Sequence, residues 1–174
     1  GPFAGKEGKF LTSRNISERL YRETLSNVSL KINNTNDTDI FEVCGRGELQ
    51  MAILIETMRR EGYEFMVSKP RVITKEKDGI KLEPVESVFL DVEEDHVGVI
   101  TEKLSNRKGR MVNLYNNGYG RTMLEFKVPS RGMIGFRSQF LTDTKGSGVL
   151  NSLFHSYSPW FGNISQRNSG VIVA

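Results

Sequence analysis

Gly45-Arg46-Gly47-Glu48-Leu49 and Pro129-Ser130-Arg131-Gly132-Met133 are the two runs of this sequence that decide its fold. Each run follows a stretch in which apolar residues alternate, as in a strand, and precedes apolar residues at helical spacing. The chain therefore repeats one strand-to-helix joint in its two halves. A repeat of this length is typical of a duplicated small domain rather than of a solenoid, so we predict two α+β domains in tandem.

The second half of the chain, residues 81–156, carries the pattern of a ferredoxin-like domain. Alternating runs and helical spacings follow in the order strand, helix, strand, strand, helix, strand. The pair Asn117-Gly118 between the two middle strands is a strong hairpin signal. This order predicts a split βαβ sandwich, which is an antiparallel sheet with two helices on one face. The predicted elements are strand 88–92, helix 97–104, strand 112–114, strand 124–128, helix 131–142 and strand 149–154.

The first half, residues 1–80, predicts the same ferredoxin-like sandwich without its opening strand. Thr12 or Ser13 can cap its first helix. Residues 1–9 are too rich in glycine and charge to form a strand. The remaining predicted elements are strand 28–32, strand 40–44, helix 47–61 and strand 63–67.

Both ends of the chain indicate a piece of a longer protein. Gly1-Pro2 resembles the pair of residues that a protease leaves behind, and Val171-Ile172-Val173 begins a strand with no later partner. Residues 157–174 are therefore predicted to start a further, C-terminal domain. Because the missing opening strand would lie inside the sheet, we expect the first domain to be loosened. Alternatively, it borrows a strand from residues 170–174 or from another copy of the chain.

The composition is that of a globular protein with a mild basic excess. Apolar residues make up 37% of the chain and charged residues 26%, and the net charge is +3 with a pI near 9.0. Such a charge permits contact with nucleic acid without demanding it. The single cysteine, Cys44, falls in a predicted strand and is interpreted as a buried, reduced thiol. No run reaches the length of a membrane span and no leader opens the sequence, so the expected location is cytoplasmic.

The most specific signal in the sequence is a set of longer runs. In the first half they are Pro2–Gly8, Gly45–Gln50, Glu56–Gly62 and Val67–Pro70, and in the second half they are Arg107–Gly109, Val128–Phe136 and Gln166–Gly170. The first group resembles the third domain of the TypA/BipA family of translational GTPases, which are related to elongation factor G and LepA. The second group resembles the fifth domain of that family and the start of its distinctive C-terminal domain. The resemblance covers essentially the whole chain.

The resemblance implies a bacterial or organellar GTPase that binds the ribosome and helps to assemble the large subunit, notably under cold or other stress. Ribosomal RNA and ribosomal proteins are then the implied partners, with tRNA and the protein's own G domain as further partners and no membrane. The G domain would precede Gly1 and would hold GTP and Mg²⁺. This chain has no Gly-x-x-x-x-Gly-Lys-Ser/Thr phosphate loop. We therefore expect no catalytic residue, no cofactor and no metal site within it.

Two groups of cations are candidate contacts for ribosomal RNA. One flanks the first predicted helix, where free amides suit phosphate, and the other lies at a loop tip between a helix and a strand. The alternatives are a solvated basic helix end for the first group and cations that offset the helix dipole for the second. The candidates are Lys6, Lys9 and Arg14 in the first group and Arg107, Lys108 and Arg110 in the second.

Arg46 and Arg131 occupy equivalent positions in the two repeated joints. This repetition favours a shared structural role, in which each arginine closes its joint by hydrogen bonds to nearby carbonyls, over contact with RNA. The glycines that flank them would allow tight turns. These glycines are Gly45, Gly47 and Gly132.

Other conspicuous side chains receive structural interpretations. The acidic run that ends at His96 is interpreted as a solvated strand end rather than a metal site, because neighbouring residues of an extended chain point to opposite faces. His155 has no placed carboxylate or nucleophile and so supports no catalytic triad. Trp160 and Phe161 are predicted to lie outside both sandwiches and to have packed on an absent domain. The aromatic residues predicted in the core are Phe126, Phe136, Phe140 and Phe154.

Two other functional classes compete with the ribosomal factor. A free-standing RNA-binding protein with two RRM-like domains would carry paired aromatics on an exposed sheet face. In this sequence the strand aromatics fall mostly on the apolar face, and the RRM signature is absent. A small-molecule-sensing regulator or enzyme would instead need a ligand pocket, which a thermal-shift screen would test.

Overall fold

The strand Lys75–Lys77, β3, decides where the chain divides. The computed structural model describes residues 5–6 and 8–164, and the chain separates into unit 1, residues 1–70, and unit 2, residues 71–174. β3 belongs to unit 2 because it pairs antiparallel with the first residues of β4 (Ile80–Glu93). The boundary predicted after residue 80 therefore falls inside this hairpin.

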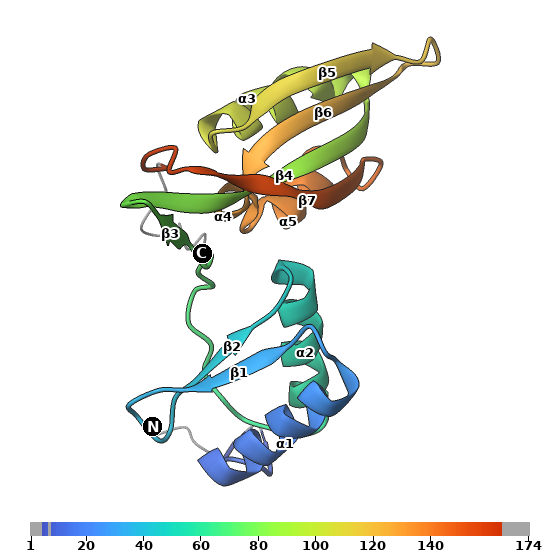
Figure 1. The fold of residues 1–174 in the computed structure, drawn as a ribbon. Helices are drawn as coiled ribbons and strands as arrows, with labels where there is room; N and C mark the ends of the chain where they lie inside the picture. Colours follow the sequence, from blue (N-terminus) through green and yellow to red (C-terminus); the bar gives the residue numbers. More distant parts are fainter. Residues whose placement is uncertain (1–4, 7, 165–174) are drawn as a thin grey trace. The chain divides into compact units, whose positions relative to one another are not determined.

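Unit 2 contains the strand and helix order that the second half of the sequence predicts. Strands β4 and β5 flank one helix, and β6 and β7 flank a second helical segment (Figure 1). The predicted boundary after residue 156 falls within the last strand. The elements are β4 (Ile80–Glu93), a 3-10 turn (Glu94–His96), α3 (Val97–Asn106), β5 (Arg110–Asn116), β6 (Arg121–Pro129), α4 (Ser130–Met133), α5 (Phe136–Asp143) and β7 (Val149–Pro159).

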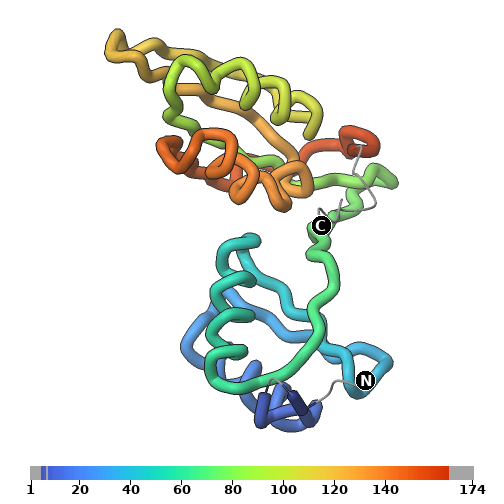
Figure 2. Tube along the Cα trace, turned by 180° about the vertical axis from the view of Figure 1, so that it is seen from behind, coloured from blue at the N-terminus to red at the C-terminus, as the bar shows by residue number. Residues whose placement is uncertain are grey.

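The sheet of unit 2 has the ferredoxin-like strand order, so the mixed α and β fold predicted for this half of the chain is confirmed. β4 pairs with both β7 and β6, and β6 pairs with β5, so the order is β7-β4-β6-β5 with every pair antiparallel. Helices α3 and α5 cover one face of this sheet, as the two opposite views show (Figures 1 and 2). Within the described residues no helix covers the opposite face, which we call the open face.

The core of unit 2 lies between the sheet and its helices. Alternate residues of β4 and β6 pack there against α3 and α5, and most are completely buried. The predicted core positions Phe126, Phe136 and Phe140 are confirmed at 0% exposure, whereas the prediction for Phe154 is wrong because 62% of it is exposed. The core residues include Val88, Leu90, Val92, Ile100, Leu104, Leu124 and Val128.

The predicted helix over residues 131–142 is interrupted. α4 ends at Met133 and α5 begins at Phe136, because Gly135 adopts a left-handed conformation with φ of 74°. A residue with a Cβ rarely adopts that conformation, so the glycine is what permits the break. After the interruption, Phe136 and Phe140 lie four residues apart in α5 and both pack into the core.

Unit 1 is a helix, two strands and a helix. Thr12 caps α1 as predicted, since its hydroxyl accepts a hydrogen bond from the Asn15 amide. β1 and β2 form a two-stranded antiparallel sheet, and the core beneath it contains Leu20 and Leu30. The elements are α1 (Ser13–Ser26), β1 (Lys31–Asn34), β2 (Phe41–Cys44) and α2 (Glu48–Arg60).

The predicted strand over residues 63–67 does not form. Tyr63 makes a single parallel bridge to Phe10, and residues 64–70 have no regular structure. A strand needs a continuous neighbouring ladder, and the described residues of unit 1 supply none beside this segment. The proposed strand donor, residues 170–174, lies outside the described residues. Cys44 is half-buried rather than buried, and its desolvation raises the pKa of the thiol.

An arginine network joins the two helices of unit 1. The Arg19 guanidinium is 8% exposed and donates to Glu61 at 2.9 Å and to Glu23 at 2.8 Å. The hydrogen bond from Arg19 lowers the pKa of the Glu61 carboxyl, and its positive charge adds to the effect. Because the bonded form is the carboxylate, protonation of Glu61 would break the link between α1 and α2.

We predict that acid weakens unit 1 through Glu61. A carboxyl whose pKa is lower in the folded state stabilises the protein above its unfolded pKa of about 4.3, and this contribution is lost as the pH falls through the folded-state pKa. The stability difference between wild type and Glu61→Gln should therefore shrink below about pH 4. Urea unfolding followed by the NMR amide signals of α1 and α2 would measure it. Glu56→Gln, which affects only an exposed pair with Arg60, is the control, and an equal pH response in both variants would contradict the prediction.

No helix within the described part of the chain is long and apolar enough to cross a membrane.

Candidate functional site

The register of the sheet arranges the side chains of the open face in rows. Lys127 of β6 lies opposite Arg110 of β5 on one side and opposite Ser87 of β4 on the other. In β6, Leu124, Phe126 and their alternates point into the core, so the residues between them belong to the open face. Those residues are Arg121, Met123, Glu125 and Lys127.

The row of Arg110 and Lys127, which we call the basic row, has the chemistry of an anion site. Like charges directly opposite each other on neighbouring strands repel, and an anion between them would relieve the repulsion. Lys127 donates to the Ser87 hydroxyl and lies 3.6 Å from Glu125. Arg110 is exposed and has no hydrogen bond or ion pair with any described residue. Its guanidinium is therefore available to a phosphate.

Lys108 extends the basic row at the turn before β5. It adopts a left-handed conformation with φ of 65°, and its side chain is exposed. The neighbouring Gly109 is required because a Cβ there would lie 2.7 Å from the Leu104 carbonyl oxygen. Lys108 and Arg110 are thus both exposed, on either side of the turn at Gly109, and their contact with RNA stays a prediction.

Arg107 differs from the other two candidate cations of its group. Its guanidinium donates to the carbonyls of Gly132 at 2.7 Å and Ile134 at 2.9 Å, and to the Gln139 side chain at 3.1 Å. It also lies over the Phe136 ring, 5.3 Å from the centroid. These contacts hold the broken helix α4–α5 against α3. Arg107 is therefore a structural residue, and Lys108 and Arg110 are the members of the group that face solvent.

Arg131 closes its joint through a buried carboxylate that the sequence analysis missed. Glu83 of β4 is completely buried and accepts hydrogen bonds from the Arg131 guanidinium and from the Phe161 amide, the latter at 2.8 Å. Arg131 also donates to the Gly162 carbonyl and stacks on Trp160 at 3.7 Å. The segment after β7 is thus bonded to the sheet, but Trp160 and Phe161 are still 36% and 47% exposed, so their packing on a further domain stays a prediction.

Lys81 adds a further cation to the same end of the sheet. Its ammonium lies 3.9 Å from the centroid of the Trp160 ring, on which Arg131 also stacks. Trp160 continues the pairing of β7 with β4 by donating from its amide to the Lys81 carbonyl. The basic row, Lys108 and Lys81 therefore all belong to the end of the sheet where β4 and β5 begin.

The opposite end of the sheet is acidic. Glu93, Glu94 and Asp95 line an open depression with Arg121 beside the β5–β6 hairpin. Arg121 donates to Asp91 at 2.8 Å. Among the described residues, which include His96, no group of three metal-binding side chains occurs.

The joint at Arg46 does not share the bonding of Arg131. The Arg46 side chain is exposed and bonds to no described residue, and only its amide is held, by the Gln50 side chain at 2.7 Å. Gly47 is fully extended, with φ of −178°, a conformation open to any residue. Only Gly132 is required by contact, because a Cβ there would lie 2.5 Å from the Arg107 carbonyl oxygen. A Cβ at Gly45 would meet only the ends of flexible side chains.

The loop before α1, which carries two of the candidate cations, is held by Glu64. The amides of Gly5 and Gly8 donate to the Glu64 carboxylate, each at 3.1 Å. Arg14 pairs with Glu18 along its own helix at 2.9 Å. Lys6 and Lys9 are exposed beside this loop. An internal carboxylate therefore takes these two amides of the loop before α1, and contact of Lys6, Lys9 and Arg14 with phosphate at the start of the helix stays a prediction.

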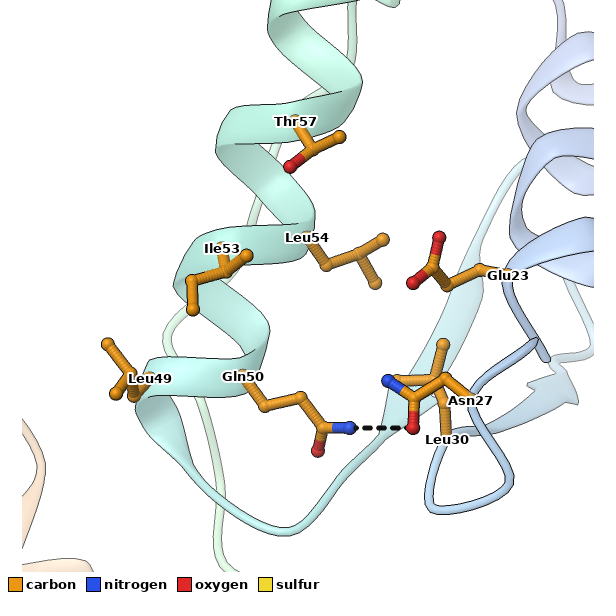
Figure 3. A pocket seen from close by; sticks show the side chains of 8 residues that line it. All are labelled: Glu23, Asn27, Leu30, Leu49, Gln50, Ile53, Leu54 and Thr57. Atoms are coloured by element: carbon orange, nitrogen blue, oxygen red, sulfur yellow. Dashed lines mark hydrogen bonds between the residues drawn. The ribbon is translucent and has the colours of Figure 1, made fainter.

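Unit 1 has a groove between α1 and α2 (Figure 3). It has a cavity volume of about 370 Å³ and a floor that contains the buried Leu30 and Leu54. Gln50 donates to Asn27 across it at 3.2 Å. Glu23, the charged residue among those that line it, is already bonded to Arg19. The groove is therefore apolar and offers no chemistry that identifies a ligand.

The sequence reasoning missed Lys81 and Lys127 in the basic end of unit 2. Lys127 could have been found, because it continues the alternation of exposed residues along β6. The aromatics also divide differently from the prediction. Phe126 is in the core, but Phe89 and Tyr115 lie on the open face, opposite Glu125 and Met123 respectively.

Comparisons with known proteins agree with this division of the chain. A family described as elongation factor G C-terminus matches residues 80–168. Proteins named large ribosomal subunit assembly factor BipA are similar over 99% of this chain: that of Bacillus subtilis (strain 168) is 52% identical, that of Escherichia coli (strain K12) 51% and that of Synechocystis sp. 50%. The chain spans 28% of the length of the first of these relatives and 29% of the other two.

Proposed function

Because this chain belongs to the elongation factor G C-terminus family and its resemblance to BipA proteins is confirmed, we propose that it serves as a ribosome-docking part of a large-subunit assembly factor. In this proposal the basic end of unit 2 contacts the phosphate backbone of ribosomal RNA. The observation that carries it is the basic row, in which Arg110, exposed and without a partner among the described residues, lies opposite the half-buried Lys127 on the open face. Phosphate contacts of this kind supply much of the affinity in protein–nucleic acid complexes.

The distribution of charge supports unit 2 as the RNA-binding unit. In residues 1–70 the lysines and arginines are balanced by the acidic residues, so the net charge of +3 arises in residues 71–174. Within unit 2 the acidic cluster lies at the other end of the sheet from the basic row. A polarised surface of this kind would orient the unit on a polyanion as well as attract it.

The same proposal assigns each part of the chain to a domain of a longer GTPase. Residues 1–80 correspond in this proposal to the third domain of a translational GTPase, and residues 81–156 and 157–174 to its fifth domain and the start of its C-terminal domain. GTP hydrolysis with Mg²⁺ is assigned to a G domain outside these residues. In this proposal the two units change the affinity for the ribosome according to the nucleotide that the G domain holds. The protein acts in the cytoplasm, and tRNA is a further partner.

We predict that Arg110→Glu weakens binding to purified large ribosomal subunits roughly tenfold, because it removes a phosphate contact and adds a like charge. Lys145→Glu is the matched control, since Lys145 is also exposed but lies in the turn before β7, at the other end of the sheet. Sedimentation of the labelled chain with subunits at several salt concentrations would measure both affinities. The salt dependence should become weaker by roughly one counterion in Arg110→Glu only. Equal affinities for the two variants would remove the basis of the proposal.

A further inference from the structure

The open face of unit 2 carries an exposed aromatic platform next to the basic row. Tyr115 of β5 is 63% exposed and lies opposite Met123 of β6, which is 46% exposed. Phe89, half-buried on the neighbouring strand β4, lies between this pair and the basic row, opposite Glu125. Exposed aromatics of this kind on a sheet are unusual unless something packs on them.

The Tyr115 ring is held in place in the free protein. Its hydroxyl accepts a hydrogen bond from the Asn113 side-chain amide at 2.8 Å. Asn113 is fixed in turn because its side-chain oxygen accepts from the Leu114 amide at 2.9 Å. Asn113 and Tyr115 are two residues apart in one strand, so this bond directs the ring along the strand. A ring fixed in this way loses little entropy when a flat ligand stacks on it.

The platform and the basic row are within reach of one short strand of nucleic acid. Met123 and Lys127, which mark the two rows on β6, are four residues apart, which is about 14 Å along a strand. A single strand with its phosphates on Arg110 and Lys127 could therefore place a base over Tyr115. A duplex could not, because its bases are stacked inside the helix and a sheet cannot enter the deep groove of A-form RNA.

We propose that the open face binds single-stranded RNA and stacks an unpaired base on Tyr115. This inference rests on the proposed function, since it specifies which form of RNA the basic row receives. Charge complementarity favours a polyanion at the basic row, and the aromatic ring distinguishes a nucleic acid from an acidic protein segment. Stacking on an aromatic ring is tolerant of base identity, so little sequence preference is expected.

Fluorescence anisotropy of the full chain with a labelled ten-nucleotide RNA would test this inference. Tyr115→Ala should raise the Kd roughly tenfold, in line with the loss of one stacked base. Tyr119→Ala is the matched control, because Tyr119 is 91% exposed at the tip of the β5–β6 hairpin, away from the platform; it should leave the Kd unchanged. Tyr115→Phe keeps the ring but loses the bond to Asn113, so its Kd should lie between those of wild type and Tyr115→Ala. The emission of Trp160, the single tryptophan, would verify that each variant is folded.

The probes distinguish this inference from the proposed function. A sugar-phosphate strand of the same length without bases should bind wild type and Tyr115→Ala equally, and a duplex RNA should bind more weakly than the single strand. A single-stranded DNA of the same sequence that binds as well as the RNA would overturn the assignment to RNA. If Arg110→Glu loses RNA binding and Tyr115→Ala does not, the stacking inference is wrong, whereas the proposed phosphate contact stands. If polyglutamate competes with the RNA and Tyr115→Ala leaves the Kd for RNA unchanged, the open face binds an acidic protein instead.

Discussion

Glu83→Ala should lower the free energy of unfolding of unit 2 by about 3–5 kcal/mol, the range found when one partner of a buried ion pair is removed. Glu83 is 0% exposed and the Arg131 side chain 13% exposed, so the arginine would be left without a countercharge in a poorly hydrated site. The Phe161 amide would lose its acceptor as well. Both losses fall at the point where β4, α4 and the segment after β7 meet.

Urea unfolding followed by Trp160 fluorescence would measure this effect. Trp160 is the single tryptophan and contacts Arg131, so its emission reports on unit 2 at the site of the change. Glu125→Ala is the control because Glu125 has only a 3.6 Å contact with Lys127 on the surface, a pair worth about 1 kcal/mol or less. The double variant Glu83→Leu/Arg131→Met should recover most of the lost stability, since it removes both charges together. A double variant as unstable as Glu83→Ala would contradict this account of the ion pair.

The sheet of unit 2 could be predicted because its signal is local. In β6 alternate residues are buried, and the Asn117-Gly118 turn joins it to β5. The alternation of apolar residues along a strand, however, does not show how far the helices cover that strand. Phe154 continues the core-facing alternation of β7, yet it is 62% exposed. β7 has 11 residues and spans about 36 Å, while α5 has 8 residues and spans about 12 Å, so the end of the strand extends beyond its cover.

The contacts that define the candidate site could not be predicted in the same way. Glu83 and Arg131 are 48 residues apart in sequence, and no local pattern pairs them. The break between α4 and α5 depends on the left-handed Gly135, although a continuous helical spacing surrounds it. The strand expected at residues 63–67 had the right alternation, but a strand forms only where a neighbour supplies hydrogen bonds. Tertiary context decided each of these features.

Arg107→Met should lower the free energy of unfolding of unit 2 by at least about 3 kcal/mol, because hydrogen bonds to charged groups contribute about 1.5–3 kcal/mol each and those to two carbonyls are lost together. The guanidinium links α3 to the carbonyls of Gly132 and Ile134, which belong to the α4–α5 break. Arg110→Met also removes one positive charge, three residues further along the chain, but it breaks no bond to a described residue. It should change stability by about 0.5 kcal/mol or less, as surface substitutions usually do.

The two substitutions should also differ in their effect on the affinity for RNA. This comparison tests which of the cations around Gly109 contact RNA and which are structural. At temperatures where both variants are folded, Arg110→Met should weaken binding to the large ribosomal subunit, and Arg107→Met should not. Trp160 unfolding curves and sedimentation with subunits, measured on the same samples, would give both quantities. If Arg107→Met were fully stable and yet failed to bind, Arg107 would be an RNA contact. Its bonds to Gly132 and Ile134 would then be a resting position that RNA replaces, and the division between structural and RNA-binding cations drawn here would be wrong.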